Sequence, residues 1–239
     1  MFNDIFIKIN GSFSSESKIR QGLNKIEVVK LGFEADCPLL ADVAVRMDNL
    51  GQINRINKIN WDGSDYKPEV YFKIAYGEKE IYLKYYVREE YVKAEMTGIN
   101  QNVYEDSCVE FFVSPEDDGI YYNFEFNSIG AFLLGSGSGR QDRIRINPRV
   151  ADRIRCLPSM GYDPFAERRG EQKWTLTVAI HLDMLFRHDV NNIKDREFRA
   201  NFYKCGDGLT RPHYLSWNPV LSEKPDFHRP EYFGIIHFK

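Results

Sequence analysis

Apolar and polar residues alternate one by one along most of this chain beyond residue 70, and this period of two limits the folds that it can adopt. In the segment 70–76 the apolar positions are Val70, Phe72, Ile74 and Tyr76. Successive side chains of a β-strand point to opposite faces, so such a run is typical of a strand with one buried face. The alternation returns in further segments: 81–87, 109–113, 122–126, 174–180, 198–202 and 235–238.

Turn-forming residues separate these segments. Residues 76–79 (YGEK) and 114–119 (SPEDDG) have the composition of hairpin turns. Helical periodicity is scarce: residues 181–186 predict one or two turns with Asp183 near their start, and residues 40–50 fit either a short helix or a strand. The pattern therefore predicts an all-β fold, an antiparallel β-sandwich or barrel with few short helices.

Length and composition narrow the class of protein. The chain has 239 residues, 43% hydrophobic and 28% charged, which excludes a disordered chain. We expect a single domain, with an N-terminal extension over residues 1–60, in which residues 5–9 alternate as a strand would, and a core over residues 60–239. The net charge of −3 argues against nucleic acid as a partner, and no apolar run reaches the ~18 residues of a membrane span. Since no signal peptide opens the chain, we expect a cytoplasmic protein if Met1 is the native start, and a periplasmic or secreted one otherwise.

The cysteines and histidines show no metal-binding spacing. None of the four cysteines forms a CxxC pair, so neither a zinc finger nor a disulfide scaffold is indicated, and we expect mostly buried thiols. The five histidines contain no HExxH motif. No cofactor is expected, apart from a structural calcium ion that the acidic turn 116–118 could hold; an ordinary turn is the favoured interpretation.

Alternation also places polar residues together. If the strands around residues 110, 125 and 201 are neighbours, one surface carries Glu110, Asn123, Glu125, Asn127 and Asn201. Amides and carboxylates next to aromatic rings suit sugars, because hydroxyls need donors and acceptors while the C–H face of a sugar needs a ring. A plain solvated sheet face is the alternative. The two glutamates could also be the acid/base pair of a glycosidase.

Two stretches resemble a known family of carbohydrate-binding modules. The strand EDSCVEFFVSP and the closing segment SWNPVLSEKPDFHRPEYFG, with the sequence between them, are similar to carbohydrate-binding family 9 in its family-9-like branch, over roughly residues 60–239. The resemblance implies a jelly-roll β-sandwich without catalytic residues. The best-known members are appended to xylanases and hold the end of a glycan between two aromatic rings, which implies glycan-degrading enzymes as partners.

The resemblance carries over to single residues only in part. The glutamate of the family falls on Glu110, and its two clamping tryptophans fall near Tyr104 and Phe227. An arginine position of the family falls on Glu125, and Trp217 matches a scaffold position with either a core or a site role. The site therefore departs from the family pattern, which implies another ligand or none.

Two further segments allow a binding or a structural interpretation. Residues 140–155 hold six arginines and two aspartates, which suits capture of an anionic glycan or a uronic acid but equally suits a solvated segment paired with surface acids. Residues 134–139 (LGSGSG) resemble a phosphate-binding loop in composition only, and a flexible turn is the favoured interpretation.

These observations favour a non-catalytic carbohydrate-binding β-sandwich that acts in carbohydrate utilisation. The proposed site residues are Tyr104, Glu110, Asn123, Glu125, Asn127, Trp217 and Phe227. The alternatives are a glycoside hydrolase that uses Glu110 and Glu125, and a protein-interaction module with a vestigial sugar site.

Overall fold

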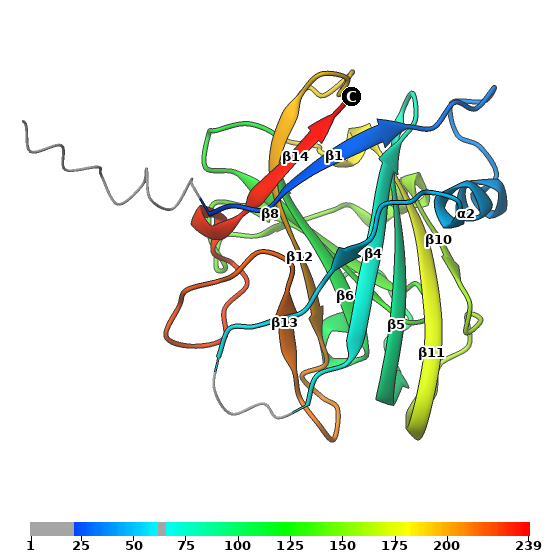
Figure 1. Ribbon diagram of the computed structural model, residues 1–239, viewed down its shortest axis with the longest axis vertical. Helices are drawn as coiled ribbons and strands as arrows, with labels where there is room; N and C mark the ends of the chain where they lie inside the picture. Colours follow the sequence, from blue (N-terminus) through cyan, green and yellow to red (C-terminus); the bar gives the residue numbers. More distant parts are fainter. Residues whose placement is uncertain (1–21, 62–65) are drawn as a thin grey trace, which may run out of the picture.

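A computed structural model describes residues 22–61 and 66–239, and the expected strand at residues 5–9 lies outside them. In the described residues fourteen strands form one sheet that curls over on itself (Figure 1). The strands are β1 (Lys25–Lys30), β2 (Asn54–Arg55), β3 (Lys58–Ile59), β4 (Glu69–Tyr76), β5 (Glu80–Ala94), β6 (Cys108–Ser114), β7 (Tyr121–Asn127), β8 (Phe132–Gly137), β9 (Ile144–Arg145), β10 (Ile154–Pro158), β11 (Phe165–His181), β12 (Glu197–Cys205), β13 (Tyr214–Ser216) and β14 (Gly234–Phe238). Beside them lie the helix α2 (Leu40–Asp48) and the 3-10 turns η1 (Val103–Glu105), η2 (Pro148–Arg153), η3 (Leu182–Met184) and η4 (Pro230–Tyr232).

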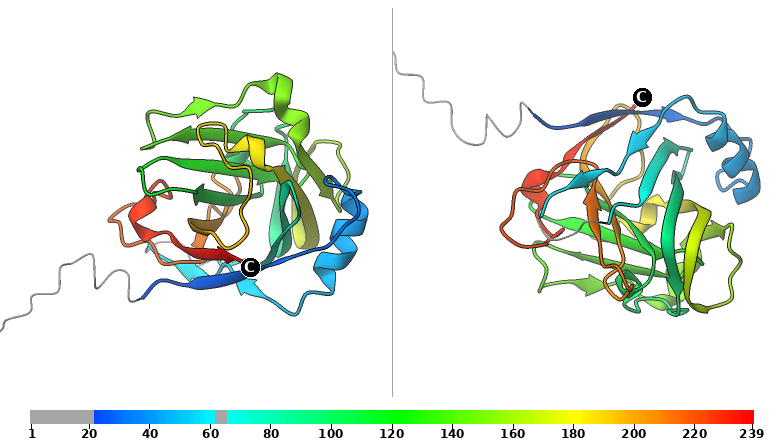
Figure 2. Two further views of the ribbon diagram at one scale, coloured as in Figure 1. Left: turned by 90° about the horizontal axis from the view of Figure 1, so that it is seen from above. Right: turned by 60° about the horizontal axis from the view of Figure 1, so that its bottom comes forward.

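The curled sheet makes two layers, which confirms the predicted β-sandwich. One layer has the strand order β10-β11-β5-β4, and the other has the order β14-β12-β6-β7-β8-β9. Strand β1 joins the layers, because it pairs in parallel with β4 on one side and with β14 on the other (Figure 2). The other pairings are antiparallel, as predicted. The parallel pairs were not foreseen, because their partners are far apart in the sequence and no hairpin turn marks them.

Both predicted hairpins are present. The amide of Gly77 donates to the carbonyl of Glu80 over 2.8 Å at the turn between β4 and β5. At the turn between β6 and β7, the hydroxyl of Ser114 donates to the carbonyl of Ile120 over 2.7 Å. These local bonds fix the register of the strands that follow, and so decide which residues face each other.

Helical structure is short, as expected. Residues 40–48 form α2, which settles the open choice in this segment in favour of a helix, with Val43 and Met47 buried against β4, β5 and β11. At residues 181–186 only the single turn η3 forms, and its N-cap is His181, whose Nδ1 accepts from the amide of Asp183. In the described residues no helix has the length and apolar character needed to cross a membrane.

The hydrophobic core lies between the layers. Phe72 of β4 stacks on Phe202 of β12 with ring centroids 3.8 Å apart, and Trp217 meets both rings edge-on. Burial of such apolar surface, worth roughly 25 cal/mol per Å², drives the two layers together.

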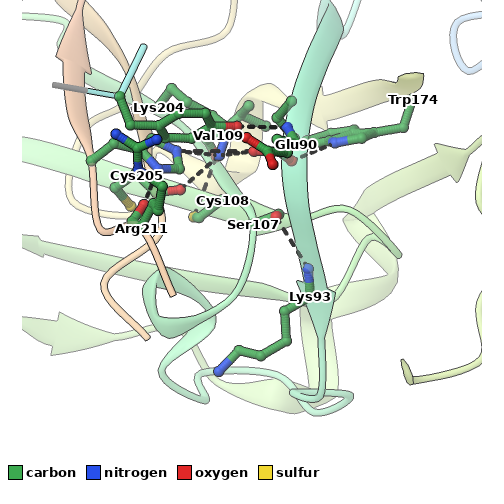
Figure 3. A network of polar contacts seen from close by, with 12 residues as sticks. Glu90, Lys93, Ser107, Cys108, Val109, Trp174, Lys204, Cys205 and Arg211 are labelled. Atoms are coloured by element: carbon green, nitrogen blue, oxygen red, sulfur yellow. Dashed lines mark hydrogen bonds and ion pairs between the residues drawn. The ribbon is translucent and has the colours of Figure 1, made fainter. Parts of the chain in front are cut away.

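A buried ionic cluster also joins the layers, and we call Glu89, Trp174, Lys204 and His213 the closed cluster. Lys204 Nζ lies 2.9 Å from Glu89 Oε2, and both side chains have no exposed surface. Trp174 Nε1 donates to Glu89 Oε1 over 2.7 Å. Figure 3 shows Lys204 and Trp174 reaching toward each other from β12 and β11.

Histidine completes this cluster as a neutral acceptor. Burial, together with the charge of Lys204, holds the pKa of His213 well below its ordinary value. Its Nδ1 lies 3.0 Å from the carbonyl of Arg211 and its Nε2 lies 2.8 Å from Lys204 Nζ. Nδ1 therefore carries the proton and Nε2 accepts from the lysine. The charge of Lys204 is thus balanced by the carboxylate of Glu89, and the neutral ring of His213 accepts a hydrogen bond from its ammonium group.

Candidate functional site

The register of three neighbouring strands sets two carboxylates side by side. Tyr203 of β12 pairs with Glu110 of β6, and Glu110 pairs directly with Glu125 of β7. The alternate residues of β7 pack into the core, so these side chains lie on the outer face of the layer. The sequence predicted this shared face, and the strand order confirms it.

A pocket of about 340 Å³ lies over this face. That volume is near the lower end of the ~300–1,000 Å³ of small-molecule sites, which suits a ligand of one or two sugar rings. Aromatic rings, carboxylates and arginines line it: Tyr104, Glu110, Phe112, Asn123, Glu125, Arg140, Arg143, Arg145, Cys205, Asp207, Tyr214, Pro225, Asp226, Phe227 and His228. Five of the seven proposed site residues are in this lining.

The floor of the pocket is acidic, and we call Glu110, Asn123 and Glu125 the open cluster. Asn123 Nδ2 donates to Glu125 Oε1 over 2.7 Å, and Cys205 Sγ lies 3.0 Å from Glu110 Oε1. Glu125 Oε2 is buried and has no hydrogen-bond partner among the described residues. In the described structure neither Glu110 nor Glu125 has a lysine or arginine nitrogen within 4 Å, whereas other buried acids do. The two carboxyl groups therefore keep hydrogen-bonding capacity for a ligand.

Burial controls the protonation of these two acids. Desolvation raises the pKa of Glu125 to about 7. Desolvation and the neighbouring charge of Glu125 raise the pKa of Glu110 well above its ordinary value. Two like charges at this spacing repel, so the pair holds at least one proton at neutral pH. It can therefore both donate to and accept from a hydroxyl.

Aromatic rings border this floor. Tyr104 lies in η1 and Phe227 in the segment before η4, and both are partly buried. Phe227 stacks on Tyr203 with centroids 4.1 Å apart and an interplanar angle of 14°. It also leans on Trp61 at 5.8 Å. Phe227 therefore supports the surrounding structure as well as lining the pocket.

Two proposed site residues lie elsewhere. Asn127 donates through Nδ2 to the carbonyl of Met96 and to Asp106, and its Oδ1 accepts from the amide of Ala131. These bonds consume its polar groups, so it holds loops together and does not face the pocket. Trp217 packs against Phe72 and Phe202 in the core. The structure therefore does not bring these two residues to the pocket, and for Trp217 it favours the core role over the site role. Identity and spacing do not show where loops cover a strand end.

The arginines were not among the proposed site residues. A linear alignment placed the arginine of the family on Glu125, whereas the chain turns back after β8 and brings Arg140, Arg143 and Arg145 to the pocket. Residues 134–139, expected as a turn, continue β8 as far as Gly137. The glycine-rich end of this strand was the signal for a hairpin that returns the arginine run over β7.

Metal donors are grouped at one place in the described residues. Ligand atoms of Cys108, Glu110 and Cys205 lie within 4.8 Å of one another, but burial raises the pKa of Cys108 to about 12, which keeps that thiol protonated. At the acidic turn, Asp118 accepts from the amide of Ile120 and lies 3.2 Å from His188. These contacts occupy oxygen atoms that a calcium ion would need. The structural calcium ion at this turn stays an untested prediction.

Comparison with known proteins adds an independent line of evidence. The model of a protein family described as carbohydrate-binding family 9 matches residues 41–238. The crystal structure of a candidate carbohydrate-binding protein from Bacteroides uniformis ATCC 8492 is 39% identical, with a TM-score of 0.87, and the match covers 91% of this chain and 100% of that chain.

A more distant structure shares the fold. It is a family 9 carbohydrate-binding module from Caldicellulosiruptor kristjanssonii in complex with cellotriose, 14% identical with a TM-score of 0.52. The match covers 90% of this chain and 94% of that chain. No curated protein sequence matches the chain.

Proposed function

The chain belongs to carbohydrate-binding family 9, and from this premise we propose that its pocket holds the end of a glycan or a short oligosaccharide without cleaving it. One observation carries the proposal: a buried carboxylate oxygen of Glu125 without a partner lies in a pocket bordered by Tyr104 and Phe227. A sugar hydroxyl satisfies such an oxygen, and the rings offer a surface for the apolar face of the sugar.

The binding mode follows from the layout of the pocket. Hydroxyls of a terminal sugar exchange hydrogen bonds with the open cluster, where a protonated and an ionised carboxyl can lie side by side. Arg143 fixes this cluster, because its Nε donates to Asn123 Oδ1 over 3.0 Å and orients the amide that donates to Glu125. Affinity in the mM to µM range, about −4 to −8 kcal/mol, is expected for such a small pocket.

Calorimetry with a panel of neutral and acidic oligosaccharides tests this function. Binding should weaken in Tyr104→Ala, because that side chain lines the pocket and is only partly buried. Phe227→Ala should weaken binding and also lower the melting temperature, because Phe227 stacks on Tyr203. Tyr162→Ala is the matched control, since Tyr162 is exposed and outside the pocket. Failure of every sugar to bind would overturn the proposal and favour a protein-interaction module.

Turnover separates binding from catalysis. Reducing ends should not accumulate when the protein is incubated with any glycan that it binds. Release of reducing sugar that disappears in Glu110→Gln would instead support a glycosidase. Association with glycan-degrading enzymes is a further part of the proposal, supported by the family alone.

A further inference from the structure

The turn between β8 and β9 carries cations to the rim of the pocket. Arg140, Arg143 and Arg145 line the same pocket as Glu125, although they come from a segment that follows β8. Arg140 and Arg145 are exposed, whereas Arg143 is partly buried. The three arginines therefore have different roles.

Arg143 uses its guanidinium for contacts within the protein. Its guanidinium donates to the carbonyls of Tyr121, Gly135 and Gly137 at 2.9–3.1 Å, and to Asn123 Oδ1. It also lies over the Tyr121 ring, 4.2 Å from the centroid. Because these contacts occupy its donors, Arg143 holds the β8–β9 hairpin in place. Only Arg140 and Arg145 then remain to contact a ligand.

Arg140 and Arg145 have free guanidinium groups in the described part of the chain, where neither makes a hydrogen bond or has a carboxylate within 4 Å. Asp207 and Asp226 also line the pocket, yet neither forms such a pair with them. Their positive charge still reaches its interior. Burial, together with Arg143, Arg140 and Arg145, lowers the pKa of His228 to about 3.

The backbone holds these two arginines in place. Asp142 accepts from the Ser138 hydroxyl at 2.7 Å and from the Gly139 amide at 2.7 Å, which closes the turn that carries Arg140. A Cβ at Gly137 would lie 2.5 Å from the carbonyl oxygen of Asp142, so only glycine allows this turn. The turn is therefore ordered before a ligand arrives, and less conformational entropy is lost on binding.

Glycine also lets Arg145 approach the floor. A Cβ at Gly135 would lie 2.9 Å from Asn123 Oδ1 and 3.3 Å from Arg145 Nη1. The missing side chain leaves room for the guanidinium beside the open cluster. Cations at the rim thus lie above carboxyl groups at the floor, within reach of one small molecule.

We propose that the pocket selects a hexuronic acid at the end of a glycan, with the sugar carboxylate between Arg140 and Arg145 and the ring hydroxyls on Glu110 and Glu125. The inference rests on the proposed function, because it names the class of sugar for the same pocket. Guanidinium groups bind carboxylates through two parallel hydrogen bonds. An arginine without an ion pair in the free protein gives up no protein contact when it binds a ligand in this way. A neutral hexose has the hydroxyls but leaves both arginines without a partner.

Calorimetry at neutral pH with sugars that differ only at C6 tests this inference. The probes are D-glucuronic acid against D-glucose, D-galacturonic acid against D-galactose, and the methyl ester of each acid. At least one acid should bind about tenfold more tightly than its neutral partner and its ester. This preference should shrink as salt concentration rises.

Substitution of the two arginines tests whether they cause the preference for the acidic sugar. Arg140→Gln combined with Arg145→Gln should reduce binding of the acid to the level of the neutral sugar, with the melting temperature unchanged because both side chains are exposed. Arg149→Gln, an exposed position of the same arginine run outside the pocket, should keep the preference.

The outcomes distinguish the two levels of the proposal. Equal binding of acid and neutral sugar would overturn the uronic-acid inference and leave carbohydrate binding intact. Tighter binding of glucose 6-sulfate than of glucuronic acid would overturn the carboxylate in favour of a sulfate ester. A preference that survives in the double variant would also overturn it. Failure of all sugars, neutral and acidic, would overturn the proposed function itself.

Discussion

The closed cluster buries one carboxylate and the open cluster buries two, and the clusters differ in what satisfies these groups. In the closed cluster Glu89 accepts a hydrogen bond from Trp174 through Oε1, and its Oε2, which has no hydrogen bond, lies 2.9 Å from the ammonium of Lys204. In the open cluster Glu125 Oε2 is also buried without a hydrogen bond, and in the described structure it has no cation within 4 Å either. The protein completes the first group by itself, whereas the second is completed only by something that enters the pocket. Burial of polar groups alone therefore does not mark a site; a buried carboxylate oxygen beside a pocket, with neither a hydrogen bond nor a cation, does.

Removal of the lysine from the closed cluster should have the largest effect. Lys204→Met is expected to lower the free energy of unfolding by about 3–5 kcal/mol, because Glu89 stays buried without its cation. Urea denaturation followed by tryptophan fluorescence measures this loss.

The matched control is Lys25→Met, which breaks the exposed pair of Lys25 and Glu197 and should cost less than ~1 kcal/mol. Adding Glu89→Gln to Lys204→Met should recover part of the stability, since no charge then remains unpaired. Equal losses for Lys204→Met and Lys25→Met would refute the structural role of the closed cluster.

The open cluster should make stability depend on pH in the opposite sense to an ordinary ion pair. The pKa of Glu125 rises from 4.5 to about 7 on folding, so between these values the folded protein keeps a proton that the unfolded chain releases. Glu125 should therefore contribute a fall of up to about 3 kcal/mol in the free energy of unfolding as pH rises through this window. Glu110 contributes in the same sense, whereas His213 and His228, whose pKa values are lowered, contribute in the opposite sense.

Urea midpoints measured across this pH range test that dependence. The difference between the wild type and Glu125→Gln isolates this carboxyl: the wild type should lose stability relative to Glu125→Gln as pH rises, while the exposed Glu223→Gln should follow the wild type. A difference between the wild type and Glu125→Gln that stays constant across this pH range would contradict the assignment.

Asn127→Ala should show that Asn127 stabilises the fold and does not contact the sugar, although its spacing in the sequence had placed it in the site. We expect a loss of stability of about 2 kcal/mol, because Met96, Asp106 and Ala131 lose their bonds to this side chain. Sugar affinity should stay within twofold of the wild type in calorimetry. A large loss of affinity without destabilisation would return Asn127 to the site.

Near pH 5, where the carboxyl of Glu125 is protonated, Glu125→Gln should have the smallest effect on stability and a clear effect on binding. The amide keeps the shape and still accepts from Asn123, so at pH near 5 the melting temperature should hardly change. Affinity for the glycan should fall about tenfold, which corresponds to ~1.4 kcal/mol. Unchanged affinity would show that the ligand does not reach the floor of the pocket.

Local pattern predicted much of the site. Glu110, Asn123 and Glu125 alternate with buried residues of β6 and β7, so their shared outer face follows from the period of two. The hairpin turn at 114–119 made β6 and β7 neighbours, since a short turn between two strands pairs them. Tyr104 and Phe227 came from the motifs of the family, and the structure places both at the pocket.

The sequence by itself thus determined which residues are strands, which side of each strand is apolar, and the family. Only the tertiary structure decided that β1 joins the layers, that Lys204 meets Glu89, that Trp217 is core, and that Arg140 and Arg145 lie above Glu125. The reason is physical: the direction of a side chain within a strand depends on the backbone of a few residues. Which distant segments meet depends on how the whole sheet closes around its core.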